Sequence, residues 1–164
     1  MFSFFKQKEE KVKELVAFAS GKTIPIDRVN DPVFSSRALG DGIAILPEEE
    51  IITAPCDGEI IAIMDESRHA VGIRLNNGAE ILIHEGIETV NLRGKGFAGL
   101  VEKGQKVKSG DPIIQFSRQA VLDAGYEYIC ILVITNQNEC PHVTYNYETD
   151  AVQKETVILK FAES

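Results

Sequence analysis

Residues 69–84 read His69-Ala-Val-Gly-Ile-Arg-Leu-Asn-Asn-Gly-Ala-Glu-Ile-Leu-Ile-His84, two strand-like runs separated by turn residues. Asn and Gly tolerate the left-handed backbone of tight turns, so this stretch predicts a β-hairpin with a histidine at each end. A two-residue turn at Asn77-Gly78 sets His84 opposite Val71, which makes the two histidines diagonal neighbours on one face. A turn one residue earlier sets them directly opposite. A three-residue loop would separate them, because a one-residue slip turns a strand over.

Two imidazoles on one face are a candidate active site. A neutral imidazole, with an ordinary pKa of ~6.5, can attack phosphorus or take up a proton, while a second ring donates a hydrogen bond. The alternative for each ring alone is a hydrogen-bonded core residue. The third histidine, His142, lies far along the chain beside Pro141. No Gly-x-x-x-x-Gly-Lys-Ser/Thr phosphate loop occurs, so we predict no nucleotide or other cofactor.

Composition indicates a globular protein with a protein partner. The 164 residues are 44% hydrophobic and 26% charged, which suits one domain. We expect that domain at residues 21–164, after an N-terminal arm at residues 1–20. The net charge of −8 argues against a nucleic-acid partner, whose phosphates need a basic surface, and favours a basic protein. Three cysteines without Cys-x-x-Cys spacing, and no signal peptide, indicate the cytoplasm: Cys56, Cys130 and Cys140.

The N-terminal arm begins Met1-Phe-Ser-Phe-Phe and continues into a run rich in Lys and Glu. Such a segment can form a short amphipathic helix at a membrane surface, so peripheral membrane contact, through the arm or a permease partner, is one hypothesis. A flexible, solvated arm is the alternative. Its charges follow the apolar residues, which excludes a secretory leader. The longest apolar run, residues 129–134, is far too short to span a membrane.

Beyond residue 20, short apolar or alternating runs are separated by turn residues. They predict strands at Thr23–Ile26, Gly42–Leu46, Glu59–Met64, His69–Leu75, Ala79–His84, Pro112–Phe116, Tyr128–Thr135 and Thr156–Phe161. A short helix is predicted at residues 117–124, with Ser117 as its N-cap and Gly125 as its stop. The predicted fold is all-β, an antiparallel β-sandwich or compact barrel with one or two short helices.

Several blocks occur in a characteristic order: Val29-Asn-Asp-Pro-Val-Phe34, Gly40-Asp-Gly-Ile-Ala-Ile45, Ala54-Pro-Cys-Asp-Gly58, His69-Ala-Val-Gly-Ile73, Gly78-Ala-Glu-Ile-Leu-Ile-His84 and Gly86-Ile-Glu-Thr-Val90. From about Thr23 to Lys160 the chain resembles the glucose-type enzyme IIA component of the bacterial phosphoenolpyruvate-dependent sugar phosphotransferase system. The resemblance implies a β-sandwich phosphocarrier. Such a carrier takes a phosphoryl group from phospho-HPr and passes it to a cysteine of a separate IIB domain.

The resemblance also implies roles for particular residues. His84 matches the phosphorylated histidine, and His69 matches the second histidine that supports the phosphoryl group in transfer. Ser67 stands where the family usually has a threonine whose hydroxyl holds that second ring. The implied docking surface is apolar with an acidic rim and consists of Asp31, Val33, Phe34, Leu39, Gly86, Ile87, Glu88 and Val90. Without the resemblance, Phe34 and Val90 would be assigned to the core.

Glu85 departs from the family pattern, because an apolar residue usually follows the nucleophile. On a regular strand its side chain points to the face opposite His84, and we favour this interpretation, with Glu85 as a solvated rim charge. The alternative is that a turn at Gly86 leans the carboxylate toward the phosphohistidine, where like charges repel. The chain between Met64 and His69 is also one residue longer than the common family spacing.

Two rival functions remain open. His69 and His84 with Glu80, Glu85 or Glu88 offer ligands for zinc, as in a zinc-dependent hydrolase. The chain lacks the His-x-His pair and the His-x-x-x-Asp motif of zinc peptidases with a related hairpin, so we predict no metal site. The second rival is a regulatory protein whose histidine phosphorylation state switches docking to transporters or kinases. That role and phosphoryl transport can coexist in one protein.

Overall fold

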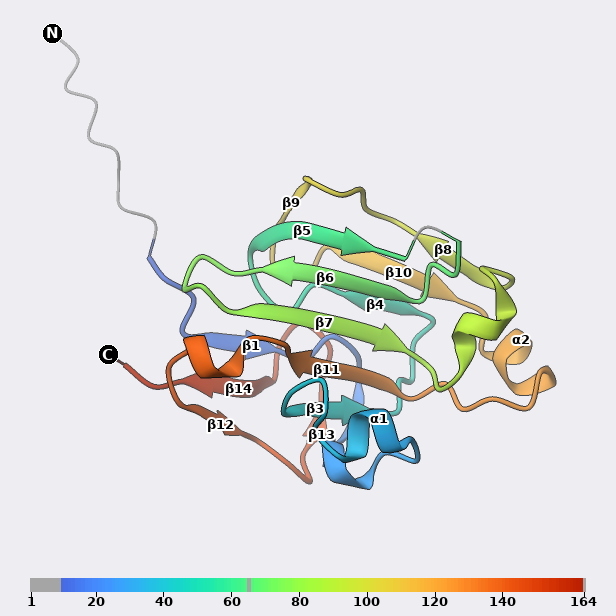
Figure 1. The fold of residues 1–164 in the computed structure, drawn as a ribbon, viewed down its shortest axis with the longest axis horizontal. Helices are drawn as coiled ribbons and strands as arrows, with labels where there is room; N and C mark the ends of the chain where they lie inside the picture. Colours follow the sequence, from blue (N-terminus) through green and yellow to red (C-terminus); the bar gives the residue numbers. More distant parts are fainter. Residues whose placement is uncertain (1–9, 65, 164) are drawn as a thin grey trace, which may run out of the picture.

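The structure, a computed structural model, describes residues 10–64 and 66–163. Its strands pair antiparallel and form one large sheet and two smaller sheets (Figure 1). Two short α-helices and three turns of 3₁₀ helix complete the described fold. The all-β antiparallel prediction, with one or two short helices, is therefore confirmed.

The large sheet has the strand order β13-β2-β3-β11-β7-β6-β5-β9. All five residues of β11 are buried, because both faces of this part of the sheet are covered. The two strands of the predicted hairpin, β6 and β7, pair beside β11 (Figure 1). The bounds are β2 (Gly21–Pro25), β3 (Gly42–Ile45), β5 (Gly58–Ile63), β6 (Ala70–Arg74), β7 (Glu80–Glu85), β9 (Lys106–Val107), β11 (Cys130–Ile134) and β13 (Asp150–Ala151).

Two three-stranded sheets complete the β structure. One has the order β4-β10-β8, with β4 (Ile51–Thr53), β8 (Phe97–Gly99) and β10 (Pro112–Phe116). The other has the order β1-β14-β12, with β1 (Glu14–Val16), β12 (Val143–Tyr145) and β14 (Val157–Phe161). The main core lies between these sheets and one face of the large sheet, and includes Ile52, Ile81, Ile83, Ile114, Leu132 and Leu159.

The helical segments are η1 (Ile26–Arg28), α1 (Pro32–Ser35), η2 (Thr89–Leu92), α2 (Arg118–Asp123) and η3 (Gln137–Glu139). The predicted cap of α2 is confirmed, because the Ser117 hydroxyl accepts a hydrogen bond from the Ala120 N–H at 3.1 Å. Gly125 follows the helix with a φ of 81°, the left-handed conformation of a helix stop. Asp31 caps α1 by accepting from the Val33 N–H at 2.9 Å.

A second, smaller core covers the other face of the large sheet. There η1 and α1 lie against β3 and β11, and their side chains Ile26 and Phe34 bury Ala44 and Ile131. Ile87, which follows β7, closes the same cluster. Because β7 alternates, the face covered by this cluster is the one that carries His84.

The end of the expected N-terminal arm belongs to the fold. The strand β1 pairs with β14, and Leu15 and Phe18 are fully buried in the main core. Further upstream, the Asn76 side chain accepts from the Val12 N–H at 2.7 Å and donates to the Glu10 carbonyl at 2.8 Å. Residue 20 is therefore not the boundary of the arm. Residues 1–9, which carry the amphipathic-helix hypothesis, lie outside the described residues.

Membrane-spanning segments were sought among the helices of residues 10–64 and 66–163. None of these helices combines the length and the apolar character needed to cross a bilayer.

Candidate active site at the histidine pair

The hairpin between β6 and β7 closes with a three-residue loop, so the predicted two-residue turn is wrong. Leu75 pairs with Ala79, since its N–H donates to the Ala79 carbonyl at 2.8 Å. Gly78 adopts a φ of 91°, and the Asn77 side chain accepts from the Ala79 N–H at 3.0 Å, which stabilises the longer loop. The residue opposite His84 is therefore Ala70 and not Val71 or His69.

The two histidine rings nevertheless meet. Their centroids are 4.4 Å apart, and the rings are close to perpendicular, at 85°. His69 precedes the first residue of β6, so the alternation of the strand does not fix the direction of its side chain. Arg68 before it takes a left-handed φ of 52°, which redirects the chain as it enters the strand. The structure thus brings the pair together through an irregular strand entry and not through hairpin register.

Aromatic side chains enclose the pair. The Phe34 ring lies 4.9 Å from the His84 ring, and the Phe97 ring lies 6.4 Å from the His69 ring, both edge-to-face. His69 is only 2% exposed, whereas His84 is partly exposed. Of the two rings, His84 is therefore the one that an incoming reactant can reach.

Burial keeps both rings neutral. The pKa of His84 is lowered to about 4, mainly by burial and in part by the neighbouring His69, against the opposing effect of the Gly86 backbone. The pKa of His69 is lowered by burial, against the effect of the Ser67 backbone. Both Nδ1 atoms are buried without a hydrogen-bond partner among the described residues. This leaves Nε2 as the nitrogen through which either ring can act on a reactant.

Ser67 lies beside the pair but contacts it differently from the expectation. It is 4% exposed, and its backbone carbonyl, not its hydroxyl, is the group that raises the pKa of the His69 ring. The hydrogen bonds between described side chains include none from the Ser67 hydroxyl.

Glu85 is neither a solvated rim charge nor a neighbour of the His84 ring. The strand continues regularly through this residue, so its side chain points to the face opposite His84. That face is covered by the main core, and Glu85 is 0% exposed and paired across the ladder with Cys130. Burial raises the pKa of Glu85 well above its ordinary value. The favoured interpretation was correct that the Glu85 side chain points away from His84, and wrong that this side chain is solvated.

A family model described as the phosphoenolpyruvate-dependent sugar phosphotransferase system, EIIA 1, matches residues 13–140. The chain belongs to this family. The PTS system glucose-specific EIIA component of Bacillus anthracis is 39% identical to it over 146 residues, which are 89% of this chain and 88% of that protein. The solved structure of glucose permease IIA from Mycoplasma capricolum superposes with a TM-score of 0.78 at 31% identity and covers 96% of this chain and 98% of that one.

EIIA units also occur inside longer proteins. The PTS system mannose-specific EIIBCA component of Corynebacterium glutamicum is 37% identical over 149 residues, which are 91% of this chain and 22% of that protein. The glucose-type EIIA resemblance is confirmed by these comparisons. This EIIA chain is thus a phosphocarrier component of the sugar phosphotransferase system, and its histidine pair is the candidate site for that role.

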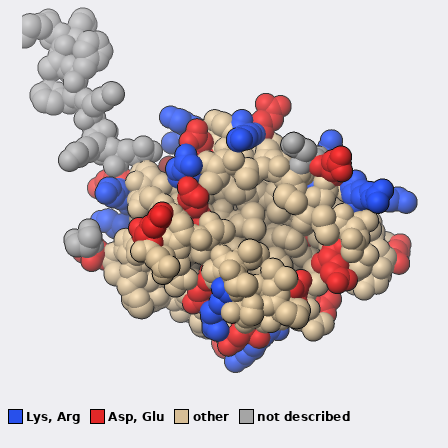
Figure 2. All heavy atoms as spheres, in the orientation of Figure 1, with Lys and Arg blue, Asp and Glu red and all other residues tan. Residues whose placement is uncertain are grey.

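The residues expected to form the docking surface divide into two groups. The exposed group consists of Val33, Leu39 and Val90, at 52%, 39% and 47%, together with the exposed Glu88. Phe34 and Ile87 are buried, at 4% and 8%, and belong to the smaller core. Gly86, also expected at this surface, is buried as well, and Asp31 is partly exposed. Figure 2 shows charged side chains mainly around the margin of the visible face, with uncharged surface across its centre.

Within residues 10–64 and 66–163, Glu80, Glu85 and Glu88 do not complete a metal site with the histidine pair. Glu80 forms an ion pair with Arg74 at 3.3 Å, and Glu85 points to the opposite face of the sheet. Across the part of the chain that the structure describes, no group of three His, Cys, Asp or Glu is placed to hold one ion.

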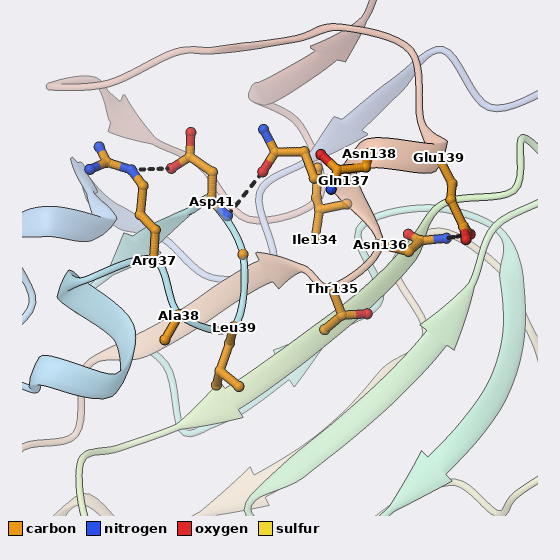
Figure 3. A pocket seen from close by; sticks show the side chains of 11 residues that line it. Arg37, Ala38, Leu39, Asp41, Ile134, Thr135, Asn136, Gln137, Asn138 and Glu139 are labelled. Carbon is orange, nitrogen blue, oxygen red and sulfur yellow. Dashed lines mark hydrogen bonds and ion pairs between the residues drawn. The ribbon is translucent and has the colours of Figure 1, made fainter.

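A surface pocket of about 550 Å³ lies between the loop after α1 and the segment around η3 (Figure 3). Its polar groups bond to one another: Arg37 Nε donates to Asp41 at 3.1 Å, and the Asp41 N–H donates to Gln137 at 3.0 Å. Leu39 lines the pocket, but neither His69 nor His84 does. The pocket is therefore separate from the candidate active site.

Proposed function

We propose that this EIIA protein accepts a phosphoryl group from phospho-HPr on Nε2 of His84 and passes it to a cysteine of a separate IIB domain. The observation that carries the proposal is the edge-to-face pair of neutral rings, 4.4 Å apart, with both Nδ1 atoms buried. The partly exposed ring, His84, is the acceptor, and the buried ring, His69, supports it.

Uptake begins with attack by the Nε2 lone pair of neutral His84 on the phosphorus of the donor phosphohistidine. The new P–N bond forms as the donor P–N bond breaks, and the bonding electrons return to the donor ring. Charge spreads over the three phosphoryl oxygens, where an N–H of His69 donates a hydrogen bond. The fixed ring pair supplies orientation, so no metal or nucleotide takes part in the step.

Onward transfer repeats the chemistry with a thiolate. The IIB cysteine sulfur attacks phosphorus, the S–P bond forms, and the P–N bond to His84 breaks. The lone pair returns to Nε2, which leaves the neutral ring ready for another cycle. His69 again stabilises the moving phosphoryl group through its hydrogen bond.

Docking uses the exposed apolar side chains Val33, Leu39 and Val90, with Asp31 and Glu88 as acidic rim charges. Apolar contact at the centre carries affinity, and the rim charges steer a basic partner. The net charge of −8 acts in the same direction. HPr and the IIB domain would use this surface in turn, because each must bring its reactive atom to the same His84 nitrogen.

The test is a reconstitution with phosphoenolpyruvate, enzyme I and HPr, followed by a IIB domain. We expect the EIIA protein to gain one acid-labile, base-stable phosphoryl group, and to lose it when the IIB domain is added. A protein that gains no phosphoryl group in the complete mixture would contradict the proposal. A phosphoryl group that IIB domains never remove would contradict its second half.

A further inference from the structure

Glu85 is a carboxyl enclosed by the core with no charge paired to it. It is 0% exposed, and both carboxyl oxygens are buried without a hydrogen-bond partner among residues 10–64 and 66–163. The titratable side chains that act on it are Cys130, opposite it on β11, and Arg118, at the start of α2. Both favour the carboxylate, but burial outweighs them and raises the pKa of Glu85 well above its ordinary value.

Arg118 directs its charge elsewhere. Its Nη2 donates to the carbonyls of Pro47 at 3.1 Å and Glu48 at 2.7 Å, and its guanidinium carbon lies 5.1 Å from the centroid of the Tyr128 ring. The ion pairs formed within the described part of the chain do not include Glu85. A carboxylate at this position would therefore stay uncompensated, and the neutral acid is the form that fits the core.

The backbone of Glu85 joins the two halves of the active site. Its N–H donates to the His69 carbonyl at 2.7 Å, and its carbonyl accepts from the Thr89 hydroxyl at 2.6 Å. The turn from Glu85 to Thr89 is tight, since a Cβ on Gly86 would clash with Thr89 Cγ2. His84 is the preceding residue. A shift of Glu85 therefore moves the acceptor ring and the strand entry that places its partner.

We propose that Glu85 is a positioning residue for phosphoryl transfer and that it acts only as the neutral acid. The neutral carboxyl faces the Cys130 thiol and anchors the end of β7. It thereby holds the His69 and His84 rings in their edge-to-face arrangement. Ionisation would draw the side chain toward water, which solvates the charge, and displace the backbone of both histidines. The inference rests on the proposed function.

The phosphoryl group itself reinforces this state. A phosphoryl dianion on His84 repels negative charge on the next residue, so the phosphorylated protein holds the Glu85 proton more tightly. By linkage, the protonated carboxyl favours the phosphorylated protein to the same extent. Loss of the Glu85 proton at alkaline pH therefore opposes phosphorylation of His84 in two ways: it displaces the histidine rings, and it places a negative charge near the phosphoryl group.

The first experiment measures the initial rate of phosphoryl uptake from phospho-HPr against pH for the wild type and Glu85→Gln. The variant keeps the size and polarity of the side chain but has no proton to lose, and the donor's own pH dependence cancels in the rate ratio. The ratio of wild type to variant should be constant near neutral pH and fall about tenfold per pH unit once Glu85 ionises. Glu85→Asp, which restores an acid, should restore an alkaline fall.

A ¹³C NMR titration of the Glu85 carboxyl in the unphosphorylated wild type needs neither the variants nor transfer. A protonated carboxyl at neutral pH, titrating where the uptake ratio falls, supports the proposal. A carboxylate resonance at neutral pH overturns it. Wild-type and Glu85→Gln profiles that coincide over the whole pH range in which both stay folded also overturn it. Absence of uptake at every pH contradicts the proposed function and the positioning role with it, whereas the NMR result reports on the neutral carboxyl alone.

Discussion

His84 and Glu85 are adjacent on β7, yet they lie in two different regions of the molecule. His84 is partly exposed on the face covered by η1 and α1, in contact with the Phe34 ring. Glu85 is fully enclosed on the opposite face, across from Cys130. Burial keeps both groups neutral, because it lowers the pKa of the base and raises that of the acid. Cover on both faces of β7 thus favours the uncharged form of an ionisable residue on either face, even at His84, whose ring stays partly exposed.

Removing the Phe34 ring, which covers the His84 face of the sheet, should have the largest effect on stability. Phe34 is 4% exposed, so Phe34→Ala should lower the free energy of unfolding by about 3–5 kcal/mol, measured by urea denaturation. Val33→Ala is the matched control, because its side chain is 52% exposed and should cost less than about 0.5 kcal/mol. Equal losses in the two variants would contradict the burial of Phe34.

Replacing the inner ring separates its role from that of the acceptor. His69→Gln keeps a hydrogen-bond donor in place of the imidazole, so His84 should still be phosphorylated. Glutamine cannot take up a proton as an imidazole can, so onward transfer to a IIB domain should slow by about 10²–10³-fold, the scale of one donor to a developing charge. Rapid-quench rates for the variant and a His142→Gln control test this. Unchanged onward rates in His69→Gln would show that the inner ring is only structural.

Lowering the pH should separate the effects of the two residues on stability, since it protonates and charges His84 but leaves Glu85 neutral. The folded pKa of His84 is about 4, below its ordinary value of 6.5. Its stabilising contribution is therefore fully present above pH ~6.5 and is lost as the pH falls toward ~4. Partial exposure of the ring limits that loss to no more than about 3 kcal/mol. The free energy of unfolding of the wild type should fall over this pH range, and that of His84→Gln should fall less. Parallel plots of unfolding free energy against pH for the two proteins would contradict a buried, neutral His84 ring.

The smallest effect is expected at the rim of the docking surface. Asp31→Asn removes the charge but keeps the oxygen that caps α1, so the helix should stay intact. HPr association, measured by stopped flow, should slow by less than about tenfold at low salt, and the difference should vanish at high salt. A faster dissociation or a salt-independent defect would place Asp31 outside the rim.

Much of the fold was predictable because its longer strands carry a clear pattern. The alternation of residues 79–84 and the apolar run around β11 predicted the strand that carries His84 and its neighbour in the sheet. The capping residue Ser117 and the stop Gly125 predicted α2. Strands of two or three residues, such as β9 and β13, were not predicted, because so short a segment shows no periodicity. These short strands form where a longer strand at the edge of the sheet offers backbone N–H and C=O groups for pairing.

The histidine pair was also predicted, but not the way the structure assembles it. Asn76-Asn77-Gly78 is compatible with two loop lengths, and the sequence does not choose between them. The rings meet despite the longer loop because His69 lies at an irregular entry to β6, where Arg68 takes a left-handed conformation unusual for its residue type. The burial of Glu85 was missed for a related reason, whereas the residue type of Phe34 alone had favoured the core in which it lies. Local alternation gives the direction of a side chain, whereas the element that covers it comes from distant parts of the chain.

The most direct test of the central claim is the site of phosphorylation. Wild type, His84→Ala and His142→Ala should be incubated with phosphoenolpyruvate, enzyme I and HPr, and the phosphoryl content measured under alkaline conditions by mass spectrometry. The account predicts one phosphoryl group on the wild type and on His142→Ala, and none on His84→Ala with unchanged folding by circular dichroism. Wild-type phosphoryl uptake by His84→Ala would contradict it.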